Sequence, residues 1–171
     1  MKTTIGALSL ALLLTATSAA AAPANELMAP VRQFLDSFNK GDVKNAEAAH
    51  AASVAIIDEV PPHAWAGAGA FQAWLADLER SSKANGQTDE AVTLGKPTRA
   101  EANGDSGYVI APATFTYRQH GKRMAEQAQM AFALHKEAAG WKIAAWAWTG
   151  GIPHAVAAKP KPKPTPEPKA P

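Results

Sequence analysis

Three residues whose side chains can exchange protons stand close together in the chain: Asp58, Glu59 and His63. Burial in apolar surroundings raises the pKa of a carboxyl group, which suits it to take a proton from a carbon next to a carbonyl. Glu59 and His63 are close enough in sequence to tune Asp58 or to share its proton. The alternative interpretation is that the two acids end a strand and keep the following loop in water. The sequence therefore gives Asp58 and His63 as candidate catalytic residues for acid–base chemistry.

The other polar residues show no pattern typical of a different chemistry. The five histidines have no i,i+2 or i,i+4 pair and no carboxylate cluster beside them, so we expect no metal site and no cofactor. The phosphate-binding pattern Gly-x-Gly-x-x-Gly and the nucleophile pattern Gly-x-Ser-x-Gly are both absent. The chain has no cysteine, which excludes disulfides, thiolate ligands and a lipid anchor on a modified cysteine. A net charge of only +2 argues against a dedicated nucleic-acid-binding protein.

Aromatic residues are the second group with a functional pattern. Trp146 and Trp148 share one face of the last expected strand, and strict alternation puts Trp141 and Ile143 on the other face. Trp65 falls in a loop after Asp58, above the expected mouth of a pocket. A cavity lined by tryptophan with a few polar groups is the usual form of a small-ligand site. We expect a pocket lined by a set of aromatic and amide side chains: Trp65, Tyr117, Gln129, Trp146 and Trp148. The alternative interpretation is that the tryptophans are ordinary core and dimer-interface residues.

The first half of the chain has the spacing of helices. Residues 26–40 carry one apolar stripe at helical spacing, with Asn25 able to cap its start, and residues 67–83 carry another that includes Trp74 as a core residue. Asp42 can cap a short helix through about residue 51, with Val43 facing inward together with Ala46 and Ala49. Between these helices, the short β-branched stretch 53–58 predicts a strand, which two prolines end.

After residue 86 the period changes to that of strands. The expected strands are 90–100, whose end Pro97 weakens, then 108–118, 122–135 and 141–149. Helices followed by an antiparallel meander indicate an α+β domain. We therefore expect a cone-shaped fold, in which a curved antiparallel or mixed sheet packs on three N-terminal helices and leaves an interior pocket.

The two ends differ in composition from this body. Residues 1–24 have a basic start, an apolar run and small residues, which is the layout of a cleavable signal peptide with cleavage after Ala24. The apolar run is too short to span a bilayer, so we expect a periplasmic or secreted product without a transmembrane segment. Residues 153–171 form a Lys/Pro-rich tail that we expect to be disordered, which leaves residues 25–152 as the folded domain.

The order of elements, together with Trp141-Lys-Ile-x-x-Trp146 in the last strand, resembles the nuclear transport factor 2-like superfamily, which includes SnoaL-like polyketide cyclases and ketosteroid isomerases. The stretch from Asp58 to Asp77, Asp-Glu-Val-Pro-Pro-His-Ala-Trp-x-Gly-x-Gly-Ala-Phe-x-x-Trp-Leu-x-Asp, is similar to the SnoaL-like subgroup. The resemblance covers about residues 26–151. It implies a curved-sheet cone of the cystatin-like roll type and a homodimer, but no particular activity, because this fold serves both enzymes and binding modules.

The resemblance to ketosteroid isomerases applies to only part of their active site. Their base aspartate corresponds without a gap to Asp58, which follows Gly41 by 17 residues. Their tyrosine in the first helix corresponds to Phe34, which cannot donate a hydrogen bond. Their protonated acid in the penultimate long strand has no counterpart in residues 127–133, where Gln127 or Gln129 could donate more weakly. Proton-transfer chemistry would therefore need another hydrogen-bond donor to the oxyanion, such as Tyr108, Tyr117 or His63.

Three functions remain open at this stage. The first is a secreted SnoaL-like module that binds a small apolar molecule without converting it. The second is an acid–base enzyme, an isomerase, cyclase or dehydratase, that uses Asp58 with His63. The third is a non-catalytic envelope-interaction protein, tethered by its Lys/Pro tail.

Overall fold

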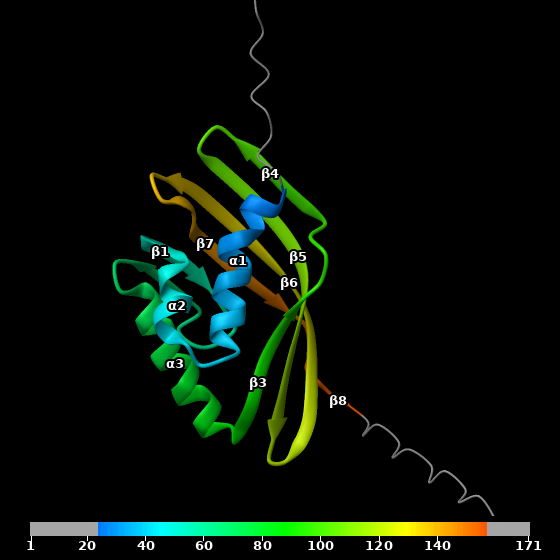
Figure 1. Ribbon diagram of the computed structural model, residues 1–171. Coiled ribbons are helices and arrows are strands. Elements are labelled where there is room, and N and C mark those ends of the chain that lie inside the picture. Colours follow the sequence, from blue (N-terminus) through cyan, green and yellow to red (C-terminus); the bar gives the residue numbers. More distant parts are fainter. Residues whose placement is uncertain (1–23, 157–171) are drawn as a thin grey trace, which may run out of the picture.

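A computed structural model describes residues 24–156; the expected signal peptide, apart from Ala24, and residues 157–171 of the expected tail lie outside this range. The described chain contains three helices and a large curved sheet (Figure 1). In chain order the elements are α1 (Ala24–Phe38), α2 (Val43–Ala48), β1 (His50–Ile57), β2 (Ala64–Gly67), α3 (Ala70–Ala84), β3 (Gln87–Leu94), β4 (Arg99–Asn103), β5 (Ser106–Gln119), β6 (Lys122–Glu137), β7 (Gly140–Gly150) and β8 (His154–Ala155).

The helices form where the apolar stripes predict them. α1 buries Leu27, Val31 and Phe34 along one side, at the spacing of a helix that lies on a core. The expected cap of α2 is confirmed, because Asp42 Oδ1 accepts a hydrogen bond from the Asn45 backbone N–H at 3.1 Å. Two details are wrong: Val43 is exposed rather than inward, and α1 already includes Asn25 instead of starting after it.

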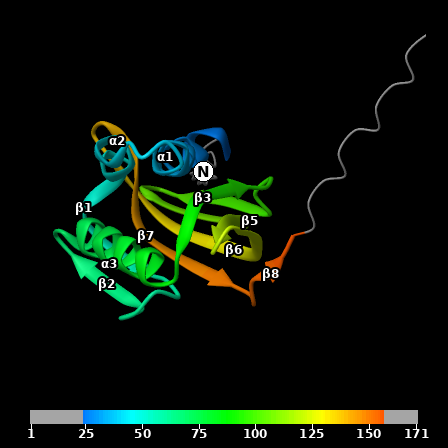
Figure 2. The same ribbon diagram turned by 90° about the horizontal axis from the view of Figure 1, so that it is seen from below.

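The sheet is mixed and has the strand order β2-β1-β7-β6-β5-β3, with β4 added to β5 and β8 to β6. β1 runs parallel to β7, and every other described pairing is antiparallel. The long strands β5 and β6 curve, and the helices lie on the concave side of the sheet (Figures 1 and 2). The α+β cone with three helices against a curved sheet is therefore confirmed.

Residues 90–100 form parts of two strands rather than one. β3 ends at Leu94 and β4 begins at Arg99, and both pair with the long strand β5. The backbone N–H groups of Gly95 and Thr98 donate to carbonyls of β5 across the break, so the connection stays attached to the sheet. The short strand β2, which the sequence pattern did not predict, pairs with β1 just after the Pro61-Pro62 loop.

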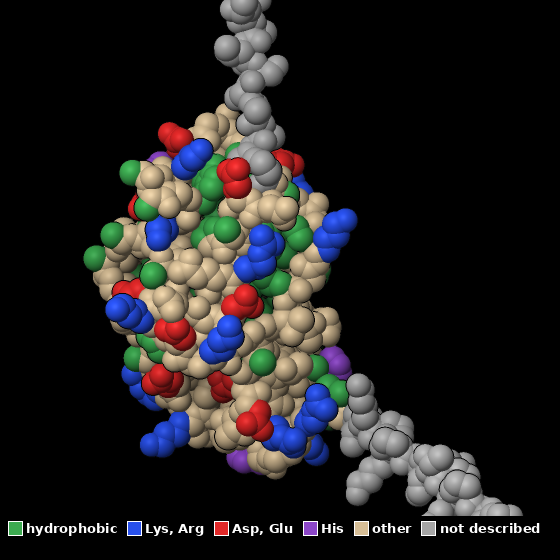
Figure 3. Space-filling view, viewed as in Figure 1, with side chains coloured by type: hydrophobic (Ala, Val, Ile, Leu, Met, Phe, Trp, Pro, Cys, Tyr) green, Lys and Arg blue, Asp and Glu red, His purple; other side chains and the backbone are tan. Residues whose placement is uncertain are grey.

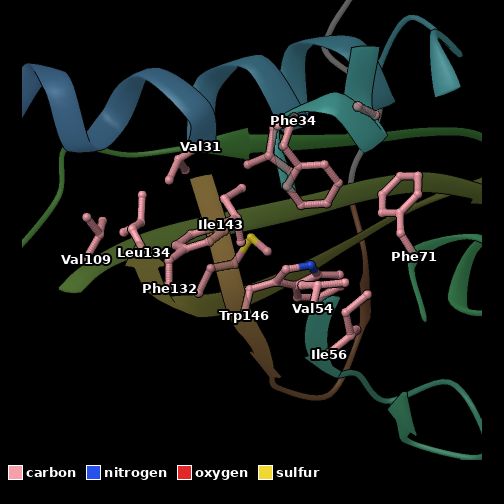
Figure 4. Packing of buried hydrophobic residues seen from close by; sticks show 14 of the residues in the cluster. Val31, Phe34, Val54, Ile56, Phe71, Val109, Phe132, Leu134, Ile143 and Trp146 are labelled. Carbon is pink, nitrogen blue, oxygen red and sulfur yellow. The ribbon is translucent and has the colours of Figure 1, made fainter. Parts of the chain in front are cut away.

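A bulge in β7 overturns the strict alternation expected for the last long strand. The pairing with β6 passes from Leu134–Ile143 to Ala133–Ala145, so Ala144 is an extra residue on β7. An extra residue inverts the side on which later side chains point. Ile143 and Trp146 therefore both face the core, as Figure 4 shows, and Trp141 is buried as well.

The sheet continues slightly past the expected end of the domain at residue 152. β8, at His154 and Ala155, pairs with Ala125 and Met124 of β6. Ala125 is buried although it lies on the face of β6 opposite to the main core.

The main core lies between α1, α3 and the concave face of the sheet. Its largest fully buried apolar side chains are Phe34, Phe132, Leu27, Ile56 and Ile143. Figure 4 shows α1 lying across the strands that carry Phe132 and Ile143. On the outside, lysine, arginine and acidic side chains are interspersed over the helical face (Figure 3). Within residues 24–156, no helix has the length and apolar character that a bilayer span requires.

Candidate functional site

A cavity of about 380 Å³ opens between α1, α3 and the curved sheet. Its volume lies in the range of small-molecule sites, and most of its wall is aromatic or aliphatic. The wall residues come from α1, the β1–β2 loop, α3 and the turn after it, the strands β3, β5, β6 and β7, and the β7–β8 connection: Phe34, Leu35, Phe38, Asp58, Glu59, Val60, Pro61, Trp74, Leu78, Ser81, Asn85, Gln87, Val92, Phe115, Tyr117, Met130, Trp146, Trp148 and Pro153.

Asp58 lies in this wall directly after the last residue of β1. Its Oδ2 accepts a hydrogen bond from Trp74 Nε1 at 3.0 Å, and its Oδ1 accepts one from the Val60 backbone N–H at 3.2 Å. Burial raises the pKa of the Asp58 carboxyl group, while these two donors act in the opposite direction. Asp58 is thus a half-buried carboxyl group, held in one orientation from two sides.

Glu126 of β6 is the most deeply buried acid in the described chain, with an exposed fraction of 0%. Its Oε1 accepts a hydrogen bond from Trp148 Nε1 at 2.9 Å, and no N–H group, alcohol or phenol of the described residues donates to its Oε2. Gly150 makes room for this carboxyl group, because a Cβ at position 150 would coincide with Glu126 Oε1. The missing side chain at Gly150 of β7 therefore leaves the space that the Glu126 carboxyl group of β6 occupies.

Glu59 lies next to both acids. The pKa of Glu59 is raised to about 7, first by partial burial and then by the charge of Glu126 and a hydrogen bond to it, with a smaller contribution from Asp58. A carboxyl group with such a pKa is partly protonated at neutral pH, so it can donate a proton as well as accept one. Glu59 and Glu126 thus form a pair that shares a proton.

Tyr117 of β5 supplies the phenol group of the site. Its side chain is buried in the cavity wall beside Phe115, with ring centroids 4.9 Å apart. Burial and the charge of Glu126 both raise the pKa of Tyr117, and a hydrogen bond with Gln87 acts in the opposite direction. The phenol therefore stays protonated and can donate a hydrogen bond.

The structure brings together only some of the residues expected from the sequence. Asp58, Tyr117, Trp146 and Trp148 all lie in the cavity wall. Trp65 does not: it is buried on β2, and its Nε1 donates to Asp77 Oδ2 at 2.9 Å.

Gln129 and His63 also lie away from the cavity wall. Gln129 is exposed, since it points to the convex side of β6. His63 is exposed in the turn after the two prolines, where its φ is 76° and its carbonyl accepts from the Asp58 N–H at 3.1 Å. His63 therefore supports the backbone of Asp58 without placing its ring in the cavity.

Two residues of the site were missed by reasoning from the sequence. Trp74, assigned to the core, holds Asp58 in the cavity wall. Glu126 stands one residue before the stretch 127–133, in which an acid was sought. A signal for it existed: Glu126 shares its strand parity with Met130, Phe132 and Leu134, so it belongs to the apolar face of β6.

A second hollow of about 620 Å³ lies between α3 and β3 on the outer side of Phe38 and Phe71. Its charged wall residues are Glu79, Lys83 and Glu90. Its wall contains neither tryptophan nor a buried acid. The first cavity is therefore the candidate functional site of the described residues, and the second hollow is not.

Comparison with known proteins identifies the fold. The amino-acid sequence matches no protein-family model and no curated protein. Among solved structures, a nuclear transport factor 2-like protein with a cystatin-like fold from Novosphingobium aromaticivorans is similar, with 16% identity, 72% of this chain and 79% of that chain covered, and a TM-score of 0.59.

Two further solved structures carry names that refer to enzymes. A ketosteroid isomerase-like protein from Erwinia carotovora atroseptica is 19% identical over 74% of this chain and 94% of that one, with a TM-score of 0.57. A type 2 hexachlorocyclohexane dehydrochlorinase is 10% identical over 82% of this chain and 93% of that one, with a TM-score of 0.65. At these identities the likeness shows the fold alone, and it confirms the fold that the sequence resemblance implied.

Proposed function

We propose that this protein uses the nuclear transport factor 2-like fold to bind a small, largely apolar molecule in the cavity between α1, α3 and the sheet. The observation that carries the proposal is the cavity itself, about 380 Å³ in volume, with aromatic walls and carboxyl groups gathered at one end. Apolar walls provide affinity, and a few convergent polar groups orient the ligand. Membership of the narrower SnoaL-like subgroup remains a prediction from the stretch 58–77.

A neutral fluorescent probe tests this proposal. N-phenyl-1-naphthylamine gains fluorescence when it enters an apolar site, and we expect the protein to bind it with a micromolar dissociation constant. Val92→Trp should abolish binding, because Val92 of β3 lines the cavity and a larger side chain there would fill it. Thr93→Trp is the matched control, since Thr93 is exposed on the other face of the same strand. Equal binding by the two variants, or none by the wild type, would refute the proposal.

The second candidate function is acid–base catalysis by Asp58. The observation that favours it is the hydrogen bond from Trp74 Nε1, which fixes a carboxyl group of raised pKa in an apolar wall. A carboxylate so placed can take a proton from a carbon next to a carbonyl, and Tyr117 or a protonated Glu59 could donate to the oxygen on which charge develops.

Exchange of the α-protons of 2-tetralone in deuterated water measures this activity directly. We expect exchange above the uncatalysed rate for the wild type, and at least a hundredfold less for Asp58→Asn. Asp77→Asn is the control, because Asp77 bonds Trp65 outside the cavity. If Asp58→Asn exchanges as fast as the wild type, the catalytic candidate fails and the binding proposal is unaffected.

The remaining sequence expectations extend the proposal to the whole chain. They are export with cleavage after Ala24, a homodimer, a periplasmic or secreted location and, as the third alternative, an envelope partner for the Lys/Pro tail. The intact mass of the exported protein tests the cleavage site, and its native mass tests the dimer. Unchanged fractionation after deletion of residues 159–171 would count against the tail as a tether.

A further inference from the structure

The charged groups of the cavity all have the same sign. Among the described residues of its wall, the acids are Asp58 and Glu59, and none is a lysine, arginine or histidine. The ion pairs within residues 24–156 involve other acids, namely Asp77, Asp89 and Glu101. No lysine or arginine in the described part of the chain forms an ion pair with these two acids, and the charge of His63 is the least of the influences on the Asp58 carboxyl group.

Glu126 adds a third carboxyl group behind the wall. It is fully buried, it acts electrostatically on both Glu59 and Tyr117, and it shares one proton with Glu59. A buried acid without a counter-charge is costly for a protein to keep. The shared proton neutralises only one of the two carboxyl groups, and a cationic ligand in the cavity would supply the missing positive charge.

Aromatic rings from helix α3 and from the strands β5 and β7 line the same cavity. Trp74 and Trp146 meet edge to face with centroids 5.0 Å apart, and Phe115 meets Trp148 in the same way at 6.2 Å. The indole N–H groups of Trp74 and Trp148 are bonded to Asp58 and Glu126, which fixes both rings. Faces of fixed aromatic rings attract cations, and they are the usual receptor for quaternary ammonium groups.

We propose that the ligand is a cationic amphiphile, whose ammonium group lies against Asp58, Glu59 and the aromatic rings while its apolar body fills the rest of the cavity. This inference rests on the proposed binding function and names the chemistry of the ligand. A neutral apolar ligand would leave the acids uncompensated, and an anionic ligand would be repelled by them.

The inference has a pH dependence with a definite sign. The titratable groups that face the ammonium position are Asp58 and Glu59 from the β1–β2 loop, Glu126 from β6 and Tyr117 from β5; Glu90 acts on Tyr117, and His63 acts on Asp58. Raising the pH through 7 removes the proton held at Glu59 and makes the site more negative. A quaternary ammonium ligand cannot titrate, so it should bind more tightly at pH 8 than at pH 5.5.

The test compares two probes of the same shape. Benzyltrimethylammonium and neopentylbenzene differ in charge and hardly in size, and each can be measured by displacement of N-phenyl-1-naphthylamine. We expect the cation to bind about tenfold more tightly than the neutral compound at pH 8, and to lose part of that advantage at pH 5.5, where Glu59 is protonated. Glu126→Gln and Glu59→Gln should each weaken the cation several-fold and leave the neutral compound unchanged. Glu137→Gln, an exposed position on the same strand as Glu126, should change neither.

The outcomes distinguish a failure of the cationic ligand from a failure of the proposed binding function. If the neutral compound binds as well as the cation at both pH values, the cationic ligand is excluded and the binding function stands. If neither compound displaces the fluorescent probe and the probe itself does not bind, both are excluded. If Glu126→Gln fails to fold, Glu59→Gln decides alone, because Glu59 lies at the cavity mouth and is exposed.

Discussion

Replacement of His50 by phenylalanine should change how the stability of the fold depends on pH. His50 begins β1 with an exposed fraction of 7%, and its ring packs against Phe34 and Phe71 with centroids 4.7 and 4.8 Å apart. Nδ1 bonds the carbonyl of Ala46 at 2.9 Å, and Nε2 is buried without a partner among the described residues. Burial lowers the pKa of His50 from 6.5 to about 4, so the folded protein keeps this ring neutral.

The size of the effect follows from that pKa. Above pH 6.5 His50 is neutral in both the folded and the unfolded chain, so it does not affect the pH dependence there. As the pH falls below 6.5, His50 takes up a proton in the unfolded chain but stays neutral in the folded chain. The free energy of unfolding therefore decreases. Each pKa unit corresponds to 1.36 kcal/mol, so the loss reaches about 3 kcal/mol near pH 4.

Urea unfolding followed by tryptophan fluorescence at pH 7.5 and pH 4.0 measures this loss. Other groups titrate over the same range, so the quantity of interest is the loss in the wild type minus the loss in His50→Phe. We expect that difference to be about 3 kcal/mol, and to be close to zero for His135→Phe, which replaces an exposed histidine on β6. Equal losses in the wild type and in His50→Phe would refute the reasoning that a buried neutral imidazole limits acid stability.

Two other predictions concern the acidic end of the cavity. Gly150→Ala should destabilise the fold by about 2–3 kcal/mol, because the added Cβ would displace the Glu126 carboxyl group from its hydrogen bond with Trp148. The shift of the urea midpoint measures this, with Gly151→Ala as control, where the Cβ would meet only a backbone oxygen at 3.4 Å. Glu59→Gln should raise the free energy of unfolding at pH 8.5 and not at pH 4.0. The pKa of Glu59 is higher in the folded protein than its ordinary 4.5, so the wild type loses stability as the pH rises through about 7. Because Glu59 is exposed, solvent screens this difference in the free energy of unfolding to about 1 kcal/mol. A wild type as stable as the variant at pH 8.5 would contradict the raised pKa of Glu59.

Local patterns in the sequence were enough to determine most of the secondary structure and the class of fold. The apolar stripe that includes Val31 and Phe34 depends on neighbours three and four residues away, and so it defines α1 before any packing is known. The Asp42 cap is equally local. The long alternating strands β5, β6 and β7, following the helices, led to the α+β cone and to the family resemblance. The position of Asp58 at the end of β1 followed from the same local order.

Tertiary structure alone decided which side chains meet in the site. The bulge at Ala144 shifts the register of β7 against β6, and no residue in the sequence of β7 marks it; the partner strand determines where the extra residue lies. The separation of Trp65 from the cavity and the inclusion of Trp74 depend on how α3 packs against the preceding strands β1 and β2, which brings together side chains 12 and 16 residues apart in the chain. Glu126 of β6 meets Glu59 of the β1–β2 loop only in the folded chain, where Gly150 leaves space for the Glu126 carboxyl group. A carboxyl group acquires its chemistry from its surroundings, and those surroundings are supplied by distant parts of the chain that only folding brings together.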